Sequence, residues 1–366
     1  MTTQDGTTGT LDEALERLHR TGPEFQGYLS NHGPMVVEAL VRGGQADRVH
    51  RWLDGYRRRL GETPARSREV TPDNWREALG DPRRSTDWTD HFRREIAARP
   101  WREVLAEWWP RLLPGIAAGA THPVIRTGHA VHTLLGGPQT APRTGELAHA
   151  LGYWAARFQP LPLLAVLPAG GLDAVPAVPR QEGGISGRLA QLTALPAAPD
   201  ADGPEKARQR LTGLVTAAVH RYRTHGHGEP VMLVHAATAP NAVLRTLPAL
   251  PRELWPVSLA AAWSAAAAVT AAYTPPEARP PAEATRGAAD PGEPSAPAAD
   301  PGELLAPAAD PGELLARAAD PGELLARAAA HGDDHAIKFA DTALAVGDPA
   351  ATGAALHALR LIEPAG

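Results

Sequence analysis

Apolar residues recur along most of this chain at intervals of three and four, which is the period of an α-helix. Leu11, Leu15 and Leu18 follow this spacing after Thr10, a residue that can cap a helix start. The same spacing predicts helices over about 36–41, 49–56, 101–113, 123–135, 144–158, 205–223, 231–237, 240–248 and 257–273, and from 322 to the C-terminus. The apolar run 161–170 contains prolines that make it a poor strand interior. We therefore expect an all-α fold, a single large multi-helix domain with long connections rich in Pro, Ala and Gly.

Two of these connections are unusually long. Residues 173–204 read as a loop or linker, and residues 288–329 hold four copies of a ten-residue unit of the type AADPGELLAR. A ten-residue period matches no solenoid or propeller. It fits tandem expansion of a helix start in which Asp caps and Pro follows, so only the last copy is expected to lead into a folded helix. The predicted organisation is a helical domain over 1–274, an insert over 275–321, and helices over 322–366 that complete the same domain.

Composition excludes several classes of protein. The net charge of −5 gives no electrostatic case for binding nucleic acid or an anionic membrane. The chain has no cysteine, which excludes thiolate metal sites and a cysteine nucleophile. The N-terminal residues show no signal-peptide pattern, and the most apolar run, 257–273, is short and weakly hydrophobic for a membrane span. We expect a soluble, cytoplasmic protein.

Lysine is almost absent from the chain, since only Lys206 and Lys338 occur among 36 basic residues. On a continuous helix Lys338 would share one face with His331 and His335. An arginine cannot replace a lysine that must be neutral or covalently modified, because its guanidinium does not deprotonate. The alternative is that Lys338 is an ordinary surface residue.

Two isolated histidines also suit metal ligation. His32 stands in the segment SNHGPM at a predicted helix start, where a tight turn would fix its ring. His235 follows the apolar run VMLV and is expected to be buried. Metal ligation needs several such imidazoles to converge. Alone, His32 could be a capping or packing residue, and His235 could simply bind a backbone carbonyl.

A third segment, THPVIRTGHAVH, concentrates further candidates. Helical offsets place His122, Arg126 and His129 on one face, and Gly128 leaves room for close approach of a neighbouring helix. A buried arginine here could bind an anionic or carbonyl oxygen of a substrate. The alternative is that these residues are polar and half-exposed. Fingerprints for nucleotide binding, zinc proteases and di-iron bundles are missing, and the pair Glu146 and His149 has no convincing partner.

With these residues in view, the chain resembles the questin oxidase-like family. The matching segments are NHGPMVVEAL, WREALGD, Asp87-Trp88 followed by Phe92, WREVLAEWWPRLLPG, GATHPVIRTGHAV, LVHAATAPNAVLRTLP and HGDDHAIKFADTAL, in consistent order over almost the whole chain. The Pro-rich insert departs most from the family, and His132 stands where an arginine is expected.

The resemblance implies an all-α oxygenase of aromatic polyketides. Members are associated with oxidative ring opening of anthraquinones and appear to use a mononuclear non-heme iron held by four histidines and a carboxylated lysine. Carried over by motif, the predicted iron ligands are His32, His129, His235 and His335 together with the carbamate of Lys338. His122 is the substitute if one of these histidines points elsewhere. Arg126 and Asp334 are expected to surround the site or to bind the substrate. The expected cofactor is Fe(II), and the expected partners are O2 and a small aromatic substrate.

Three other interpretations remain open at this level. The activity could be a metal-free, NADPH-dependent Baeyer–Villiger-type oxidation, or the chain could bind a polyketide without turnover. A two-metal hydrolase with a carboxylated lysine would need more carboxylates near the histidines. The nine tryptophans could form stacking walls for a polycyclic substrate or belong to the core. The substrate and the oligomeric state do not follow from the sequence.

Overall fold

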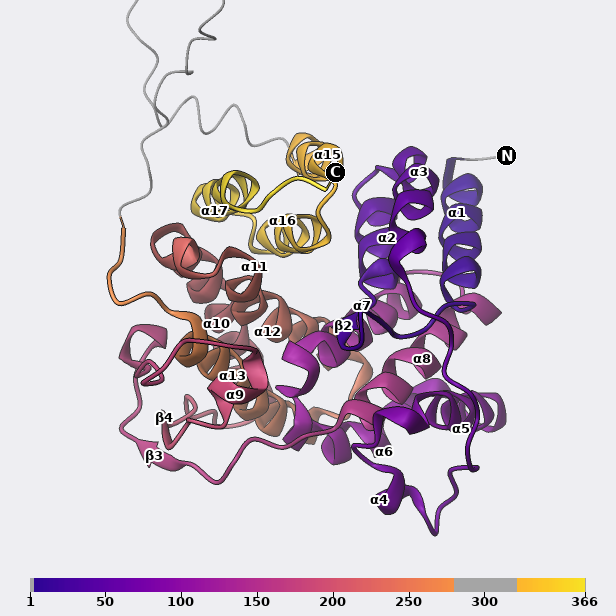
Figure 1. The fold of residues 1–366 in the computed structure, drawn as a ribbon, viewed down its shortest axis with the longest axis horizontal. Coiled ribbons are helices and arrows are strands. Elements are labelled where there is room, and N and C mark those ends of the chain that lie inside the picture. Colours follow the sequence, from indigo (N-terminus) through magenta and orange to yellow (C-terminus); the bar gives the residue numbers. More distant parts are fainter. Residues whose placement is uncertain (1–2, 280–320, 366) are drawn as a thin grey trace, which may run out of the picture.

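The computed structural model describes residues 3–279 and 321–365, and this part of the chain is a helical assembly with two very small sheets (Figure 1). The prediction of an all-α fold is confirmed. The first half contains α1 (Thr3–Leu18), β1 (Glu24–Phe25), β2 (Leu29–Ser30), α2 (Gly33–Arg42), α3 (Ala46–Tyr56), α4 (Trp75–Ala78), α5 (Ser85–Ala98), α6 (Trp101–Leu112), α7 (His122–Gly136) and α8 (Ala141–Arg157). The second half contains β3 (Ala165–Leu167), α9 (Ile185–Leu189), β4 (Ala194–Pro196), α10 (Pro204–His225), α11 (Pro230–Leu233), α12 (His235–Thr246), α13 (Trp255–Tyr273), α15 (Pro321–His331), α16 (Asp334–Val346) and α17 (Pro349–Leu361).

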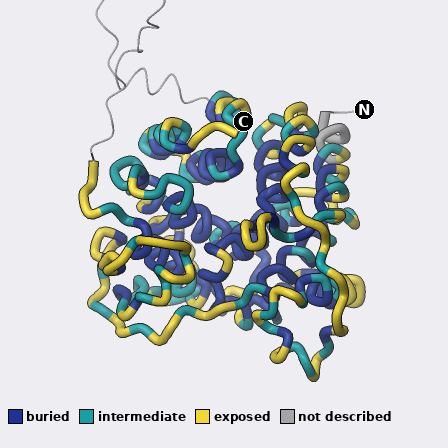
Figure 2. The backbone as a smooth tube through the Cα atoms, viewed as in Figure 1, coloured by how far each residue is buried: buried dark blue, intermediate teal, exposed yellow. Residues whose placement is uncertain are grey.

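Helices α7 and α12 form the centre of the molecule. Helix α7 packs against α2, α8 and α12, and α12 packs in addition against α10, α13 and α16. Helix α16, drawn in yellow in Figure 1, closes the assembly from the C-terminal side by contacting both α2 and α12. Buried residues concentrate along these central helices (Figure 2). Segments from the two ends of the chain therefore meet at one place in the core.

The crossing of α7 and α12 depends on a glycine. A Cβ added to Gly128 would lie 2.5 Å from the Cβ of Ala242, well inside van der Waals contact. The prediction that Gly128 permits a close approach of a neighbouring helix is confirmed. This contact brings the beginnings of both helices near each other.

Several helices differ from the sequence prediction. Residues 331–338 do not form one continuous helix, because Gly332 adopts a left-handed conformation (φ 81°) and Asp333 then caps α16. Helix α12 begins at His235 and contains Pro240, whereas a break was expected between 237 and 240. Helix α5 was not predicted at all.

Three of the four decad copies, at 288–317, lie outside the described residues. The last copy does enter a helix as expected, since α15 starts at Pro321 and buries Leu324 and Leu325. The two small sheets are a hairpin of β1 with β2 and a parallel pairing of β3 with β4, which uses part of the proline-containing run.

The most apolar helical segment, Arg252–Tyr273, has the length and hydropathy of a membrane span, but 67% of its apolar window is buried inside the protein. It therefore packs as a core helix. Seven of the nine tryptophans are buried as well, at positions 88, 101, 108, 109, 154, 255 and 263, so they belong mainly to the core.

Candidate metal centre

Four histidines from distant segments of the chain converge in the interior. The Nε2 atoms of His122 and His235 lie 3.1 Å apart. The ring of His32 stacks on that of His122 at 4.4 Å between centroids and meets the ring of His335 edge-on at 4.6 Å. Nitrogen atoms of His32, His122 and His335 lie within 4.8 Å of one another. These side chains could thus share one small ligand.

Each of these histidines stands at the start of a helix. His32 precedes α2, His122 begins α7, His235 begins α12, and His335 is the second residue of α16. Four separate helices therefore supply the four rings, and each ring is held near a helix start.

Hydrogen bonds fix the orientation of all four rings. The Nδ1 of His122 lies 2.6 Å from the carbonyl oxygen of Gly119, and that of His235 lies 3.1 Å from that of Met232. The Nδ1 atoms of His32 and His335 lie 2.6 and 2.8 Å from the same carboxylate oxygen of Asp334. Because each partner is an acceptor, each Nδ1 carries the proton, and the four Nε2 atoms keep their lone pairs.

No group among the described residues donates a hydrogen bond to these lone pairs. Burial lowers the pKa of His32 to about 3 and holds the pKa values of His122 and His235 well below the usual range, so the rings stay neutral. The buried Nε2 of His32 has no hydrogen-bond partner among the described residues. Two lone pairs at 3.1 Å, as in His122 and His235, repel each other unless a cation lies between them. The donor set therefore fits a metal ion.

Lys338 lies beside these rings, one turn after His335. Its side chain is buried, and its Nζ has no hydrogen-bond partner in the described part of the chain. Burial lowers the pKa of Lys338 to about 8, against the opposing attraction of Asp334. The neutral amine is thus within reach near neutral pH, as carboxylation by CO2 would require.

A strained turn positions His122. Gly119, Ala120 and Thr121, directly before α7, all have positive φ values, of 53°, 54° and 66°. Non-glycine residues seldom adopt this conformation, and such strain persists only where the surroundings fix it. The turn brings the Gly119 carbonyl under the Nδ1 of His122, so the strain is linked to the orientation of this ring.

A brace formed by Trp52, Tyr56 and Arg59, at the end of α3 and the turn after it, holds the other side of the cluster. Arg59 donates to the second carboxylate oxygen of Asp334 at 2.9 Å and lies over the ring of Tyr56. The hydroxyl of Tyr56 accepts from the backbone N–H of His32, and Trp52 donates to the carbonyl of Gly332. Sequence analysis missed this role, because the pattern of Trp52 and Tyr56 looked like any buried helix face.

His129 does not join the four histidines. Its Nδ1 contacts Glu38 at 2.7 Å, and Glu38 is also contacted by His132 at 3.0 Å. Nearby, Asp341 is paired with Arg42 and Arg245. Residues seven apart share a helix face but stand about 10 Å apart along the axis, too far for one ion. His122 and His129 therefore belong to two different clusters, although they share one face of α7.

Two other predicted site residues lie elsewhere. Arg126 forms a buried bidentate ion pair with Glu146, at 2.5 and 2.8 Å, and Glu146 also contacts His19. His331 ends α15 and bonds to the carbonyl of Ile362, because the break at Gly332 removes it from the face of His335. In contrast, Asp334 lies between two of the converging rings, as a residue surrounding the site would.

One comparison with known protein families found a match over part of the chain. No curated protein matches the chain. The model of the questin oxidase-like family matches residues 29–137. His32, His122, Arg126 and His129 lie within this range, whereas His235, His335 and Lys338 lie beyond it. The match confirms the family resemblance seen in the sequence and supports an oxidoreductase activity.

Proposed function

We propose that the chain is an oxygenase that holds one non-heme iron ion with His32, His122, His235, His335 and carboxylated Lys338. Its substrate would be an aromatic polyketide such as an anthraquinone, which it would oxygenate or open oxidatively. The family supports the oxidoreductase activity. The observation that carries the site is that the rings of four histidines converge beside an unpartnered lysine amine. His122 thereby takes the place that motif comparison gave to His129.

Lys338 would contribute the anionic ligand. Its neutral Nζ would attack CO2, forming an N–C bond and releasing one proton, and the resulting carbamate offers carboxylate-like oxygens. An arginine could not form the carbamate, which accounts for a lysine in a chain that otherwise uses arginine.

The iron, when bound, would supply the redox chemistry that reaction with O2 requires. The protein would hold the ligands in place and exclude water. Asp334 keeps the protons of His32 and His335 on Nδ1, and Arg59 holds Asp334. The side chains of His335 and Arg59 are 14% and 42% exposed, so the substrate would approach from their side.

Metal content tests this function most directly. The protein is purified without a histidine tag or chelator and analysed for elements, together with Lys338→Ala and a matched control, Lys206→Ala. We expect about one iron per chain, lost in Lys338→Ala and kept in the control. Absence of metal, even after anaerobic addition of Fe(II), would contradict the proposal.

Turnover is then tested by O2 uptake with anthraquinones. Uptake that depends on iron supports the oxygenase. Oxidation of NADPH by the metal-stripped protein would favour the metal-free alternative instead, and tight binding without turnover would favour a polyketide-binding protein.

A further inference from the structure

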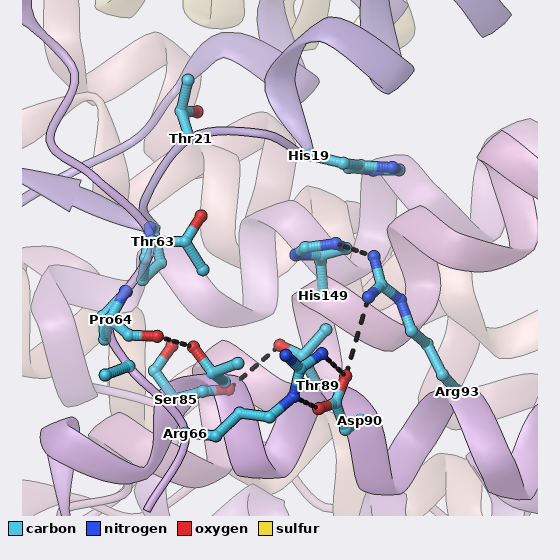
Figure 3. Close-up of a pocket in the computed structure, with 13 residues that line it drawn as sticks. His19, Thr21, Thr63, Pro64, Arg66, Ser85, Thr89, Asp90, Arg93 and His149 are labelled. Atoms are coloured by element: carbon cyan, nitrogen blue, oxygen red, sulfur yellow. Dashed lines mark hydrogen bonds and ion pairs between the residues drawn. The ribbon is translucent and has the colours of Figure 1, made fainter.

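A second site is indicated by a pocket that shares no residue with the histidine cluster (Figure 3). Its volume is about 330 Å3, and it lies between the end of α1, the loop around residues 63–66, α5 and α8. Its lining includes the rings of His19 and His149, which stack at 4.3 Å. A volume of this size suits a small organic molecule rather than a single water or ion.

His149 provides a hydrogen-bond donor to this pocket. Arg93 donates to the Nε2 of His149 at 2.8 Å, so this nitrogen must be an acceptor, and the proton resides on Nδ1. No described residue accepts from Nδ1, and the pKa of His149 is held well below its usual range by burial, which keeps the ring in this form. In Figure 3 the ring faces Thr63 across the pocket. A ligand that bonds to Nδ1 must therefore offer an acceptor.

Hydroxyl groups and charge add to this preference. The hydroxyls of Thr63 and Ser85 have no partner within the described part of the chain, whereas the other pocket threonines bond to backbone carbonyls. At the mouth, Arg66 binds Asp90 at 2.5 Å, and Arg93 lies 3.7 Å from the same carboxylate. Two guanidinium groups against one carboxylate leave one net positive charge, which attracts an anion.

Part of the lining is apolar. Pro23, Pro64 and Ala65 form part of the wall. His19 is fixed because its Nε2 bonds to Glu146, which is itself held by Arg126. A preformed wall costs a ligand little ordering on binding. Flat apolar surface beside these donors suits a planar ring that carries an oxyanion.

We propose that this pocket binds a small aromatic carboxylate. Its carboxylate accepts from His149 Nδ1–H and faces the net positive charge at the mouth, and its ring lies against Pro23 and Pro64. The site is independent of the proposed iron function, because none of its residues belongs to the histidine cluster.

Isothermal titration calorimetry of the full chain tests this proposal with three probes: benzoate, its neutral isostere benzamide, and inorganic phosphate. We expect benzoate to bind at least about tenfold more tightly than either of the others, since a hydrogen bond to a charged acceptor is stronger than one to a neutral acceptor. Phosphate binding as tight as benzoate would make the pocket an inorganic anion site and overturn the proposal. The absence of benzoate binding would overturn it too.

Variants locate the binding. Arg93→Met removes one rim cation, and Thr63→Val removes a free hydroxyl from an exposed loop, so both are expected to fold; circular dichroism verifies this. Each should weaken benzoate binding by about tenfold, whereas Arg83→Met, at an exposed arginine outside the pocket, should leave it unchanged. Unchanged affinity in the pocket variants would place the ligand elsewhere. Binding should persist in Lys338→Ala, which separates this result from the fate of the iron proposal.

Discussion

Replacing Lys338 with methionine should stabilise the metal-free protein while removing its capacity for iron. Methionine has a similar length and suits the apolar interior, where Lys338 is 1% exposed. Burial lowers the pKa of this lysine from 10.5 to about 8, so the folded state disfavours the charged amine. A pKa difference of one corresponds to about 1.36 kcal/mol, so the difference of about 2.5 means that burying the charged amine costs the folded state about 3.4 kcal/mol.

The size of this effect depends on pH. Below pH 8 both the folded and the unfolded chain hold the proton, so the folded protein carries the full cost. Between pH 8 and 10.5 only the unfolded chain keeps it, so the wild-type free energy of unfolding rises with pH relative to the variant. At pH 7 we therefore expect the free energy of unfolding of Lys338→Met to exceed that of the wild type by up to about 3 kcal/mol. This difference should disappear as pH approaches 10.5.

Urea unfolding at 25 °C measures this difference on chelator-treated protein in buffer freed of CO2. Lys206→Met is the matched control, because Lys206 is exposed and is the other lysine of the chain. If Lys338→Met were less stable than wild type at pH 7, while the control was unchanged, the amine would be making a stabilising contact and the reasoning would be refuted.

Three further changes test the surrounding structure. Asp334→Asn should weaken Fe(II) binding about 10- to 100-fold in a chelator competition, since the amide carries no negative charge and its NH2 group cannot accept from Arg59; unchanged affinity would contradict this. Gly128→Ala should lower the free energy of unfolding by about 1–3 kcal/mol because its Cβ meets α12 at 2.5 Å, whereas Gly136→Ala, with open space on the same helix, should not. Burial raises the pKa of Glu146, but the ion pair with Arg126 outweighs burial and lowers this pKa to about 2. The ion pair therefore stabilises the fold fully above pH 4.5, and the stabilisation is lost as pH falls towards 2. Glu146→Gln should then remove about 3 kcal/mol at pH 7 and flatten the acid dependence of urea unfolding between pH 5 and 2; a dependence equal to wild type would refute the assignment.

Periodicity predicted most helices because their buried faces are made of apolar residues. Helix α5 was not predicted, because its buried face is largely polar and shows no apolar periodicity. This face includes Ser85, Asp87, Thr89 and His91 beside its two large aromatic residues. The polar groups there find partners in loops distant in sequence, as Asp87 does with the backbone of residues 67 and 68. Local pattern cannot reveal such partners.

The break before α16 is a different case, because its signal was present in the sequence. Gly332 followed by Asp333 is a helix stop joined to a helix cap, and the structure uses both. The brace of Tyr56 and Arg59 carried no comparable signal. Two of its contacts, Trp52 with Gly332 and Arg59 with Asp334, join residues about 280 positions apart. These residues come together only in the folded chain, where α16 packs against α2 and α2 packs against α3.

Two buried clusters contain histidines oriented by a shared carboxylate, and charge balance distinguishes them. Around His129 and His132, the carboxylate of Glu38 lies near Arg42, and the neighbouring Asp341 is paired with two arginines, so the negative charge is already compensated. A divalent cation there would meet guanidinium groups at close range and would be repelled. Around Asp334, the one arginine paired among the described residues is Arg59, at the second carboxylate oxygen, and the Nε2 atoms of His122 and His235 lie 3.1 Å apart. A metal ion bound as proposed should therefore prefer this centre, although His129 and His122 stand on the same helix.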